Sequence, residues 1–523
     1  MSTNWYGEAV FYELYLRAFY DSNGDGHGDL RGAISKLDYI KSLGVDCIWI
    51  LPHFPSPLKD DGYDVADYRN VHPDYGTLDD FRAFVDAAHA RGLRVVIDLV
   101  MNHTSDQHPW FQAARQDRHS PYRDYYVWSD TGTEYSDIRL VFPDFEPSNW
   151  TWDAVAGQYF WHRFFRSQPD LNFDNPKVHE EMLDIVRFWL DLGVDGFRLD
   201  AVIYLYEREG TDGAGLPETH AFIQKVRRLL DQTYPDRVMI AEANDWPEAL
   251  MAYFGEQEDR PECHMCFNFP IMPRLYLALL EGDRRALDDI LRRTPQPPAG
   301  GQWLSFLRNH DELSLEMVTD EEGDALYAAF APDPRMKINN GIRRRLAPIL
   351  GFDVCQYRLL TALLMSLPGT PILYYGDEIG MGDNIWLADR NGVRTPMQWD
   401  GSLNAGFSSA EKPYAPIADS AAERTVAAQH NVPNSFLETT RKLVSVRQAS
   451  PALRHGSFEL VDLGEPALFG FRRSAENETI FCLFNLSNRP QAVSQLPAGH
   501  NLLDTNPNSL TLEPYGVYWI TLD

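Results

Sequence analysis

Eight short apolar runs, each ending in polar residues, recur along most of the chain. Runs this rich in β-branched and aromatic residues are typical of parallel strands that are buried on both faces. Helical patterns lie between them, such as LDDFRAFVDAAHARG and VHEEMLDIVRFWLDLG, each closed by a glycine. Strands that alternate with helices in this way predict an α/β fold, a (β/α)8 TIM barrel. The eight runs are AVFYELYL, VDCIWILP, LRVVIDLVMNH, VDGFRLDAV, RVMIAEAN, HMCFNFP, WLSFLRNHDE and PILYYGDE.

Two long segments interrupt the alternation, and a third segment follows it. Residues 104–176, after the third strand, are rich in aromatic residues and too long for an ordinary loop, which predicts an inserted domain over the barrel mouth. A second insertion, residues 313–352, follows the seventh strand. Residues 451–523 show short alternating runs with turn signals, which predict a C-terminal antiparallel β-sandwich domain. The barrel then comprises residues 1–103 and 177–450.

Composition narrows the class of protein. The formal net charge of −29 opposes binding to nucleic acid or to an anionic membrane surface, because phosphates would be repelled. Five Cys residues make no disulfide framework, and the C-x-x-C of Cys263 and Cys266 lacks the second pair of a zinc site, so we interpret it as two thiols on a strand. The N-terminus has no signal-peptide pattern, and no apolar run approaches ~18 residues. We therefore expect a cytoplasmic enzyme.

Polar residues follow several of the predicted strands. The C-terminal strand ends of such a barrel meet at one face, so we expect Asp98, His103, Asp200, Glu242 and Asp311 to gather there. Paired carboxylates suit glycoside chemistry: one attacks the anomeric carbon, and the other exchanges protons with the leaving and incoming oxygens. A single strand-end Asp is more often a cap or a salt-bridge partner, but three carboxylates on strands four, five and seven favour catalysis.

The segments DLVMNH, GFRLDAV, AEAN and NHD, in this order, resemble the motif set of the α-amylase superfamily, glycoside hydrolase family 13. QPDLN and VDCIWILPHFPSP are similar to its auxiliary motifs, and the similarity covers essentially the whole chain. The resemblance implies that Asp200 is the nucleophile, Glu242 the acid/base and Asp311 a stabiliser that holds the sugar's hydroxyls. Arg198 lies two residues before the nucleophile, on the same strand face, and would hold Asp200 ionised.

The same resemblance implies how the sugar is held. His103 and His310 would hydrogen-bond the glucosyl ring in the innermost subsite. KDDGYD supplies Asp60 and Tyr63, and NGVRTPMQW supplies Arg394. In family members that act on short sugars, this Asp and Arg pair across the base of the pocket while the Tyr stacks on glucose. We therefore expect a pocket for one terminal glucose and a disaccharide-sized substrate.

Longer segments, among them FWLDLGVDGFRLDAVIYLYEREGT and FLRNHDELSLEMVTDEE, resemble the members of this family that interconvert maltose and trehalose. This implies an isomerase: intramolecular transglucosylation by a retaining double displacement through a covalent glucosyl-enzyme, with minor hydrolysis to glucose. In these members an Asn, here Asn244, replaces a bulkier residue after the acid/base. Glu312, Glu316 and Arg139, the last in YSDIRLVF, would help to shut the site.

Three alternatives are weighed against this activity. The nearest is an α-glucosidase that hydrolyses short α-glucosides with the same carboxylates and a more open acceptor site. A sucrose isomerase is weaker, because nothing resembles a fructose site. A non-catalytic transporter subunit of this fold is the weakest, since the chain keeps all three carboxylates and has no membrane-spanning run. A homo-oligomer and a separate maltokinase partner stay open, and no organic cofactor is expected.

The stretch DSNGDGHGDL, residues 21–30, resembles the first half of an EF-hand loop. Its twelfth position is Gly32 rather than a bidentate Glu, so the residues alone leave a calcium sensor, a structural ion site and a polar turn open. The family resemblance implies a loop that holds one Ca²⁺ or Mg²⁺ ion and braces the barrel mouth without doing chemistry. Its implied ligands are the side chains of Asp21, Asn23, Asp25 and Asp29 and the carbonyl of His27.

A second ion site, for Ca²⁺, is also implied by the resemblance. Its ligands would be the side chains of Asn102 and Asp170 and the backbone carbonyls of Tyr204 and Leu205. Glu207 in IYLYEREG would add a further oxygen donor. Ordinary hydrogen bonding among these residues is the alternative.

Overall fold

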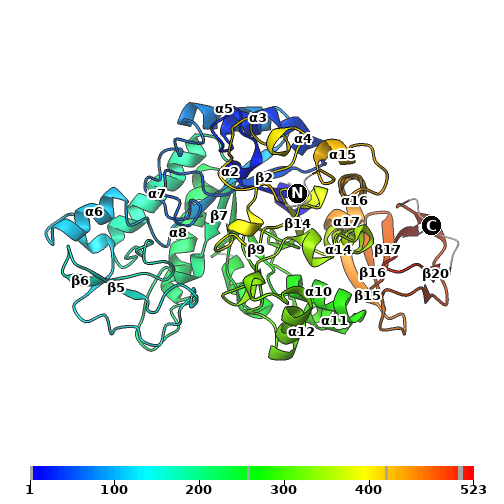
Figure 1. Cartoon of the computed structure of the whole chain (residues 1–523). Coiled ribbons are helices and arrows are strands. Elements are labelled where there is room, and N and C mark those ends of the chain that lie inside the picture. The colour runs from blue at the N-terminus through cyan, green and yellow to red at the C-terminus, as the bar shows by residue number, and fades with distance from the viewer. Residues whose placement is uncertain (1–3, 256–259, 419–421, 504–509, 523) are drawn as a thin grey trace.

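Eight parallel strands close into a barrel, which confirms the predicted fold class (Figure 1). Each strand coincides with one of the eight apolar runs, and nearly every strand residue is buried. The computed structural model describes residues 4–255, 260–418, 422–503 and 510–522. In barrel order the strands are β1 (Phe11–Leu14), β14 (Thr370–Tyr374), β10 (Gln302–Phe306), β9 (Met265–Phe267), β8 (Val238–Ala241), β7 (Gly196–Asp200), β3 (Arg94–Val100) and β2 (Cys47–Ile50).

Helices surround the barrel and begin at recognisable caps. The two expected helices are α5 (Leu78–His89), which starts with a capping box formed by Thr77 and Asp80, and α7 (Pro176–Asp191), which has Pro at its first position. The other helices of the barrel and its loops are α1 (Trp5–Glu8), α2 (Leu16–Phe19), α3 (Leu30–Ser35), α4 (Leu37–Ser42), α8 (Pro217–Thr233), α9 (Pro247–Leu250), α10 (Ile271–Glu281), α11 (Arg285–Arg293), α13 (Leu346–Ile349), α14 (Val354–Ser366), α15 (Val426–Gln429) and α16 (Phe436–Ala449).

The segment between β3 and β7 forms a small aromatic-rich unit of its own. It contains α6 (Pro109–Gln116) and an antiparallel sheet in the order β4 (Trp128–Ser129), β6 (Gln158–Trp161), β5 (Trp150–Asp153). Trp150 and Trp161 pack edge to face in this unit, with ring centroids 5.1 Å apart. The unit rejoins the barrel through an antiparallel bridge between His103 and Asp170. This bridge fixes the unit beside the C-terminal end of β3.

A second, smaller sheet follows β10. It consists of β11 (Leu313–Ser314), β13 (Gly341–Ile342) and β12 (Lys337–Ile338), and α12 (Asp320–Phe330) lies between its strands in the sequence. Short 3₁₀ helices occur in this and the other loops: η1 (Arg123–Tyr125), η2 (Val202–Tyr204), η3 (Met251–Phe254), η4 (Pro334–Met336), η5 (Asp377–Ile379), η6 (Asn391–Val393) and η7 (Leu403–Gly406).

The C-terminal part is antiparallel, as its alternation predicts. A five-stranded sheet runs in the order β15 (Ser457–Val461), β16 (Leu468–Ala475), β17 (Glu478–Asn485), β21 (Val517–Leu522), β19 (Gly499–Asn501), beside a pair formed by β18 (Gln491–Ala492) and β20 (Thr511–Leu512). It follows α17 (Pro451–His455), and in Figure 1 it lies on the side of the barrel away from the β4–β6 sheet. The buried Arg473 of β16 joins it to the barrel, because it donates to the backbone carbonyl of Ser366 at the end of α14.

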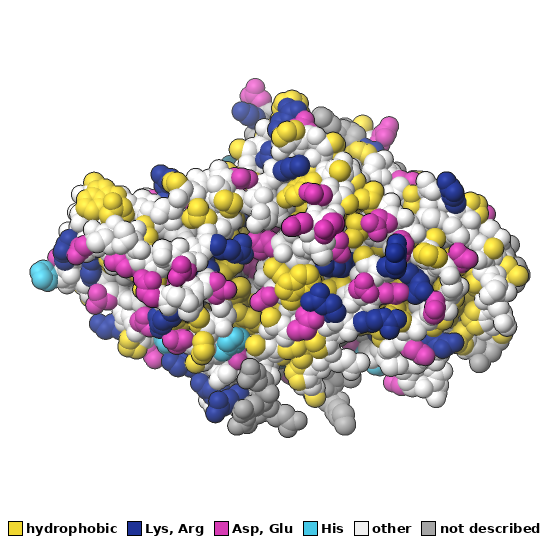
Figure 2. All heavy atoms as spheres, turned by 90° about the horizontal axis from the view of Figure 1, so that it is seen from below, with side chains coloured by type: hydrophobic (Ala, Val, Ile, Leu, Met, Phe, Trp, Pro, Cys, Tyr) yellow, Lys and Arg dark blue, Asp and Glu magenta, His cyan; other side chains and the backbone are white. Residues whose placement is uncertain are grey.

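The surface carries charges of both signs. Figure 2 shows acidic and basic side chains interspersed over one face of the molecule. The negative net charge therefore does not form a single acidic patch on that face. Among the described residues, no helix is long and apolar enough to cross a membrane.

Candidate active site

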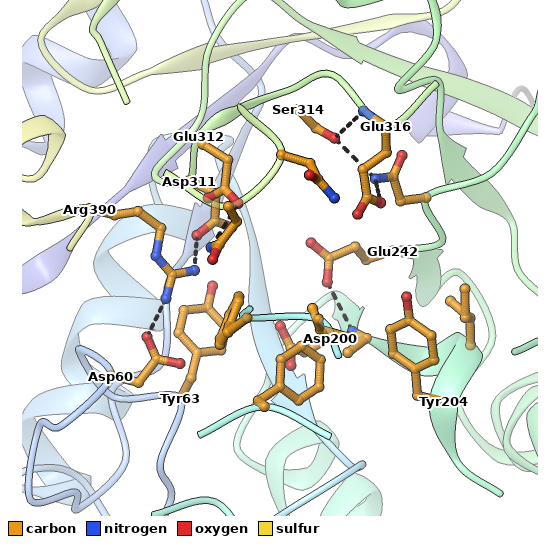
Figure 3. A pocket seen from close by; sticks show the side chains of 18 of the residues that line it. Asp60, Tyr63, Asp200, Tyr204, Glu242, Asp311, Glu312, Ser314, Glu316 and Arg390 are labelled. Carbon is orange, nitrogen blue, oxygen red and sulfur yellow. Dashed lines mark hydrogen bonds and ion pairs between the residues drawn. The ribbon is translucent and has the colours of Figure 1, made fainter. Parts of the chain in front are cut away.

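A pocket opens where the C-terminal ends of the barrel strands meet. It encloses about 960 Å³ of empty space, its open mouth included. Asp200 ends β7, Glu242 directly follows β8 and Asp311 lies in the loop after β10, and all three line the pocket (Figure 3). The three predicted catalytic carboxylates therefore share one cavity. Its other predicted lining residues are Asp60, Tyr63, His103, Tyr204, Asn244, Glu312 and Glu316.

Arg198 forms ion pairs with Asp98, Asp200 and Glu242. The strand register places Asp98 on β3 beside Arg198 on β7, and Arg198 Nη1 lies 2.5 Å from Asp98 Oδ1 and 2.6 Å from Asp200 Oδ1. Its Nη2 bonds Glu242 Oε1. Burial raises the pKa of Asp200, and Arg198 opposes this rise because its charge favours the carboxylate. Arg198 thus works in the direction that keeps Asp200 charged.

The turn after β7 gives Glu242 a second partner. Ala201 adopts a left-handed backbone, with φ of 46°, an unusual conformation for a residue with a Cβ atom. Its backbone N–H donates to Glu242 Oε2 over 2.9 Å. With Arg198 at the other oxygen, both oxygens of Glu242 are held, and the carboxyl faces the cavity beside Asp200 in Figure 3. These two donors fix the direction of the carboxyl, so that it can reach an oxygen bound to the anomeric carbon.

Asp311 lies among cations. Its Oδ1 is 2.8 Å from Arg390 Nη1 and 2.9 Å from Arg394 Nη2, and its Oδ2 is 2.9 Å from His310 Nε2. Burial alone would raise the pKa of Asp311, but these three positive groups together hold it well below its usual range. Asp311 is therefore a fixed anion that faces the cavity.

The predicted pairing of Asp60 with Arg394 is wrong. Asp60 Oδ1 instead pairs with Arg390 Nη2 at 2.7 Å, whereas Arg394 Nη1 pairs with Asp61 Oδ2 at 2.7 Å. Because Arg390 also contacts Asp311, it connects Asp60 to Asp311 across the cavity floor (Figure 3). Arg394 lies one layer deeper and is absent from the cavity wall.

The predicted sugar-holding residues lie around this floor. The ring of Tyr63 stacks on that of His310, with centroids 5.3 Å apart and planes 10° from parallel. The amide nitrogen of Gln168 lies 2.9 Å from Asp60 Oδ2 and 3.2 Å from His103 Nε2, so one side chain positions both residues. Tyr63, His103 and Asp60 reach the cavity, whereas His310 lies behind Tyr63 and Asp311.

The predicted gating residues contact one another across the mouth. Arg139, from the inserted unit, donates to Glu316 Oε1 over 2.8 Å and to Oε2 over 3.3 Å. Asn244 Nδ2 donates to Glu316 Oε2 over 2.7 Å and to Ser314 Oγ over 3.1 Å. We call Arg139, Asn244, Ser314 and Glu316 the mouth clamp. Glu312 lines the cavity nearby, and burial raises the pKa of its carboxyl.

In the second predicted ion site, two buried side-chain oxygens lack a hydrogen-bond donor. Asn102 Oδ1 and Asp170 Oδ2 are buried without a hydrogen-bond partner. Burial raises the pKa of Asp170 well above its usual value and that of Glu207 to about 7. Buried oxygens that lack donors fit a hard cation, which prefers oxygen ligands. Leu205 and Tyr204 lie in the same turn, at η2.

In the loop of residues 21–30, two of the predicted ion ligands accept hydrogen bonds from backbone N–H groups. The Asp21 carboxylate accepts from the backbone N–H groups of Asn23, Gly24 and Gly26, and Asp29 caps α3 by accepting from Gly32 N. No group of three or more His, Cys, Asp or Glu side chains in the described part of the chain is arranged to hold a metal ion. The ion expected in this loop stays a prediction.

Several residues of the site are missing from the sequence-based set. Arg390 stands four residues before Arg394, in ADRNGVRTPM, so the doubled Arg was a visible signal. Phe142 lines the cavity and lies under the Arg390 guanidinium, 5.0 Å from the ring centroid, but no local pattern sets it apart in an aromatic-rich insertion. Glu13, inside β1, contacts His310 and looks like an ordinary strand residue in the sequence.

Known proteins are similar to this chain in both sequence and fold. The sequence profile described as "Alpha amylase, catalytic domain" matches residues 13–329 and 335–456. A trehalose synthase/amylase of Mycolicibacterium smegmatis is 52% identical over 99% of this chain and 93% of its own length, and a probable alpha-glucosidase of Rhizobium meliloti is 35% identical over 94% and 91%. The solved trehalulose synthase of Pseudomonas mesoacidophila aligns with a TM-score of 0.82 at 29% identity, over the full length of both chains. The chain therefore belongs to the α-amylase family.

Proposed function

We propose that this protein interconverts maltose and α,α-trehalose by moving one glucosyl group within the bound disaccharide. Relatives at 49–52% identity that carry the name trehalose synthase support this proposal, and so does the arrangement of the pocket. The mouth clamp carries the proposal, because it joins the inserted unit, the loop after β8 and the insertion after β10 over the catalytic carboxylates.

The first displacement opens the glucosidic bond. The Asp200 carboxylate attacks C1 of the terminal glucose of maltose, and the bond between C1 and the bridging oxygen breaks. Glu242 gives its proton to that oxygen, which leaves as the O4 hydroxyl of the second glucose. The product is a glucosyl ester of Asp200, and the negative charge has moved to Glu242. Asp311, held by Arg390 and Arg394, is placed to grip the ring hydroxyls.

The second displacement forms the new bond. The released glucose turns within the closed pocket and presents its anomeric hydroxyl to C1. Glu242 takes the proton of that hydroxyl, the oxygen attacks C1, and Asp200 leaves as a carboxylate. Two inversions at one carbon preserve the α configuration of the transferred glucosyl group, and attack by the α-anomeric hydroxyl of the released glucose then gives an α,α-1,1 bond. The reverse sequence returns maltose.

Water competes with the turning glucose for the same ester. A closed mouth excludes water and retains the glucose, so the stability of the closed state sets the ratio of isomerisation to hydrolysis. We expect minor free glucose for this reason. A pocket with the same carboxylates and an open mouth would release the second glucose and act as an α-glucosidase, the second candidate, which the similarity to a probable alpha-glucosidase supports.

Product analysis with maltose tests the proposal. The protein is incubated with maltose, and glucose, maltose and trehalose are separated and quantified over time. Trehalose as the main product, together with maltose formed from trehalose in the reverse reaction, supports the isomerase. Glucose as the sole product refutes it in favour of the α-glucosidase.

We further propose a Ca²⁺ ion held by the side chains of Asn102 and Asp170, with Glu207 and the carbonyls of Tyr204 and Leu205 completing its oxygen ligands. The unpartnered oxygens of Asn102 and Asp170 support this set. The ion would supply a positive charge that binds the inserted unit to the barrel beside the bridge of His103 and Asp170. All steps of the reaction are carried by the side chains described above.

A further inference from the structure

Asp200 and Asp311 each contact a nitrogen-containing side chain, which in turn contacts a second, buried carboxylate. Behind Asp200 lies the cation Arg198, and behind Arg198 lies the buried Asp98. Behind Asp311 lies His310, and behind His310 lies Glu13, which is completely buried in β1. Each set therefore consists of a carboxylate, a nitrogen-containing side chain and a second carboxylate, in that order. An arginine stays charged at any working pH, whereas a histidine ordinarily loses its proton between pH 5 and 8.

We propose that Glu13 is a positioning residue that keeps His310 as an imidazolium ion, so that His310 can hold Asp311 as Arg198 holds Asp200. Glu13 Oε1 lies 2.5 Å from His310 Nδ1. The same oxygen also accepts from the backbone N–H of His310 over 3.2 Å, and Oε2 is buried without a hydrogen-bond partner. Oε1 is therefore an acceptor, and Nδ1 must carry a proton to meet it.

The other ring nitrogen also needs a proton. His310 Nε2 lies 2.9 Å from Asp311 Oδ2, an acceptor, and 2.7 Å from the Tyr63 hydroxyl. The Tyr63 hydroxyl also lies 3.3 Å from Asp98 Oδ2, so it can donate its hydrogen to Asp98 and accept one from His310 Nε2. A neutral imidazole has one N–H, and it would place a lone pair against an acceptor on one side of the ring or the other. Only the imidazolium satisfies both sides.

The charges around His310 agree with this state. Burial works against a charge on the ring, but Asp311 and Glu13 outweigh it and raise the pKa of His310 to about 9. The charged or titratable groups that face this cluster come from every neighbouring element. They are Glu13 from β1, Tyr63 after β2, Asp98 from β3, Arg198 from β7, Asp311 after β10, Tyr374 from β14, and Arg390 and Arg394 after β14.

Glu13→Gln tests this role. Gln has the shape of Glu and keeps an oxygen that can accept from the backbone N–H and from Nδ1 of His310. It removes the negative charge, so the pKa of His310 falls. The substrate is α-glucosyl fluoride, whose fluoride leaves without a proton, so that titration of Glu242 as an acid does not limit the rate. Fluoride release is followed between pH 5.5 and 9.5. The inference rests on the proposed glucosyl transfer, but it holds for isomerase and α-glucosidase alike.

We expect the variant to match the wild type within about threefold at pH 6, where His310 is charged in both proteins. Above pH 6 its kcat/KM declines at least one pH unit earlier than that of the wild type, a loss of about threefold or more at pH 8.5. Glu378→Gln is the matched control: Glu378 is equally buried and bonds the hydroxyls of Tyr12 and Tyr39, away from His310, and its profile should stay that of the wild type.

A Glu13→Gln profile that superimposes on the wild type overturns the inference, and so does a loss that is equal at every pH, which would indicate a merely structural role. If the variant does not fold, or if the wild type releases no fluoride, a direct measurement of the protonation state of His310 decides the matter. In ¹⁵N-histidine-labelled wild-type protein, with His310→Asn for assignment, both ring nitrogens of His310 should give imidazolium shifts at pH 7.5. A neutral ring at that pH refutes the inference, whereas an inactive wild type with a charged His310 refutes the proposed function alone.

Discussion

Replacing Arg139 by Ala should convert part of the isomerisation into hydrolysis. Arg139 donates to both oxygens of Glu316, over 2.8 and 3.3 Å. Its side chain is 47% exposed, but that of Glu316 is only 17% exposed, so the pair is partly screened. Paired charges in such a setting contribute about 0.5–1 kcal/mol. The loss weakens the closed state by that amount, a factor of about two to five in the ratio of closed to open pockets.

The glucose share of the products should therefore rise about two- to fivefold, because water gains access to the glucosyl ester in that proportion. Total maltose consumption should stay close to that of the wild type, since Asn244 still holds Glu316 and the three carboxylates are untouched. The assay measures initial rates of trehalose and glucose formation from maltose by chromatography. Arg139→Lys, which keeps the charge but cannot reach both oxygens, should fall between the two proteins.

Arg118→Ala is the control. Arg118 lies in the same insertion and is exposed, and its described hydrogen bond, to Gly157 O, is long at 3.5 Å. Its product ratio should equal that of the wild type. If Arg139→Ala gives a wild-type ratio of glucose to trehalose, or loses turnover without a change of ratio, closure by the mouth clamp does not govern the fate of the intermediate.

Three further changes test other parts of the site. Asp200→Ala should lower turnover of maltose on the order of 10⁴-fold, because it removes the nucleophile; residual turnover above a few per cent contradicts that role. Arg390→Lys should raise KM for maltose about tenfold, since one ammonium cannot bridge Asp60 and Asp311, and an unchanged KM would speak against the bridge. Chelation of divalent ions should lower Tm by about 2 °C or more in the wild type but not in Asp170→Asn; equal shifts in both proteins would place the ion elsewhere.

The barrel was predictable because each strand is marked by its own composition. Strands that are covered on both faces must be apolar, and all eight runs became barrel strands. The meeting of Asp200, Glu242 and Asp311 in one cavity was predictable because the C-terminal ends of the barrel strands share one face.

Pairings among loop residues were not predictable in the same way. Arg390 and Arg394 flank the 3₁₀ turn η6, and the path of this turn decides which guanidinium reaches Asp60. No periodicity in the sequence encodes that path. Glu13 was missed for a different reason: its partner His310 is 297 residues away, in the loop after β10, and the two come together only through the strand order β1–β14–β10 of the closed barrel.

The mouth clamp and the carboxylates belong to different parts of the chain. The contact between Arg139 and Glu316 joins the two insertions, whereas the proposed nucleophile and acid/base lie at the ends of barrel strands. Loops tolerate substitution and changes of length better than strands do. Selection can therefore adjust product choice without disturbing bond cleavage, and a mutant library confined to Arg139, Ser314 and Glu316 would explore that choice with Asp200, Glu242 and Asp311 unchanged.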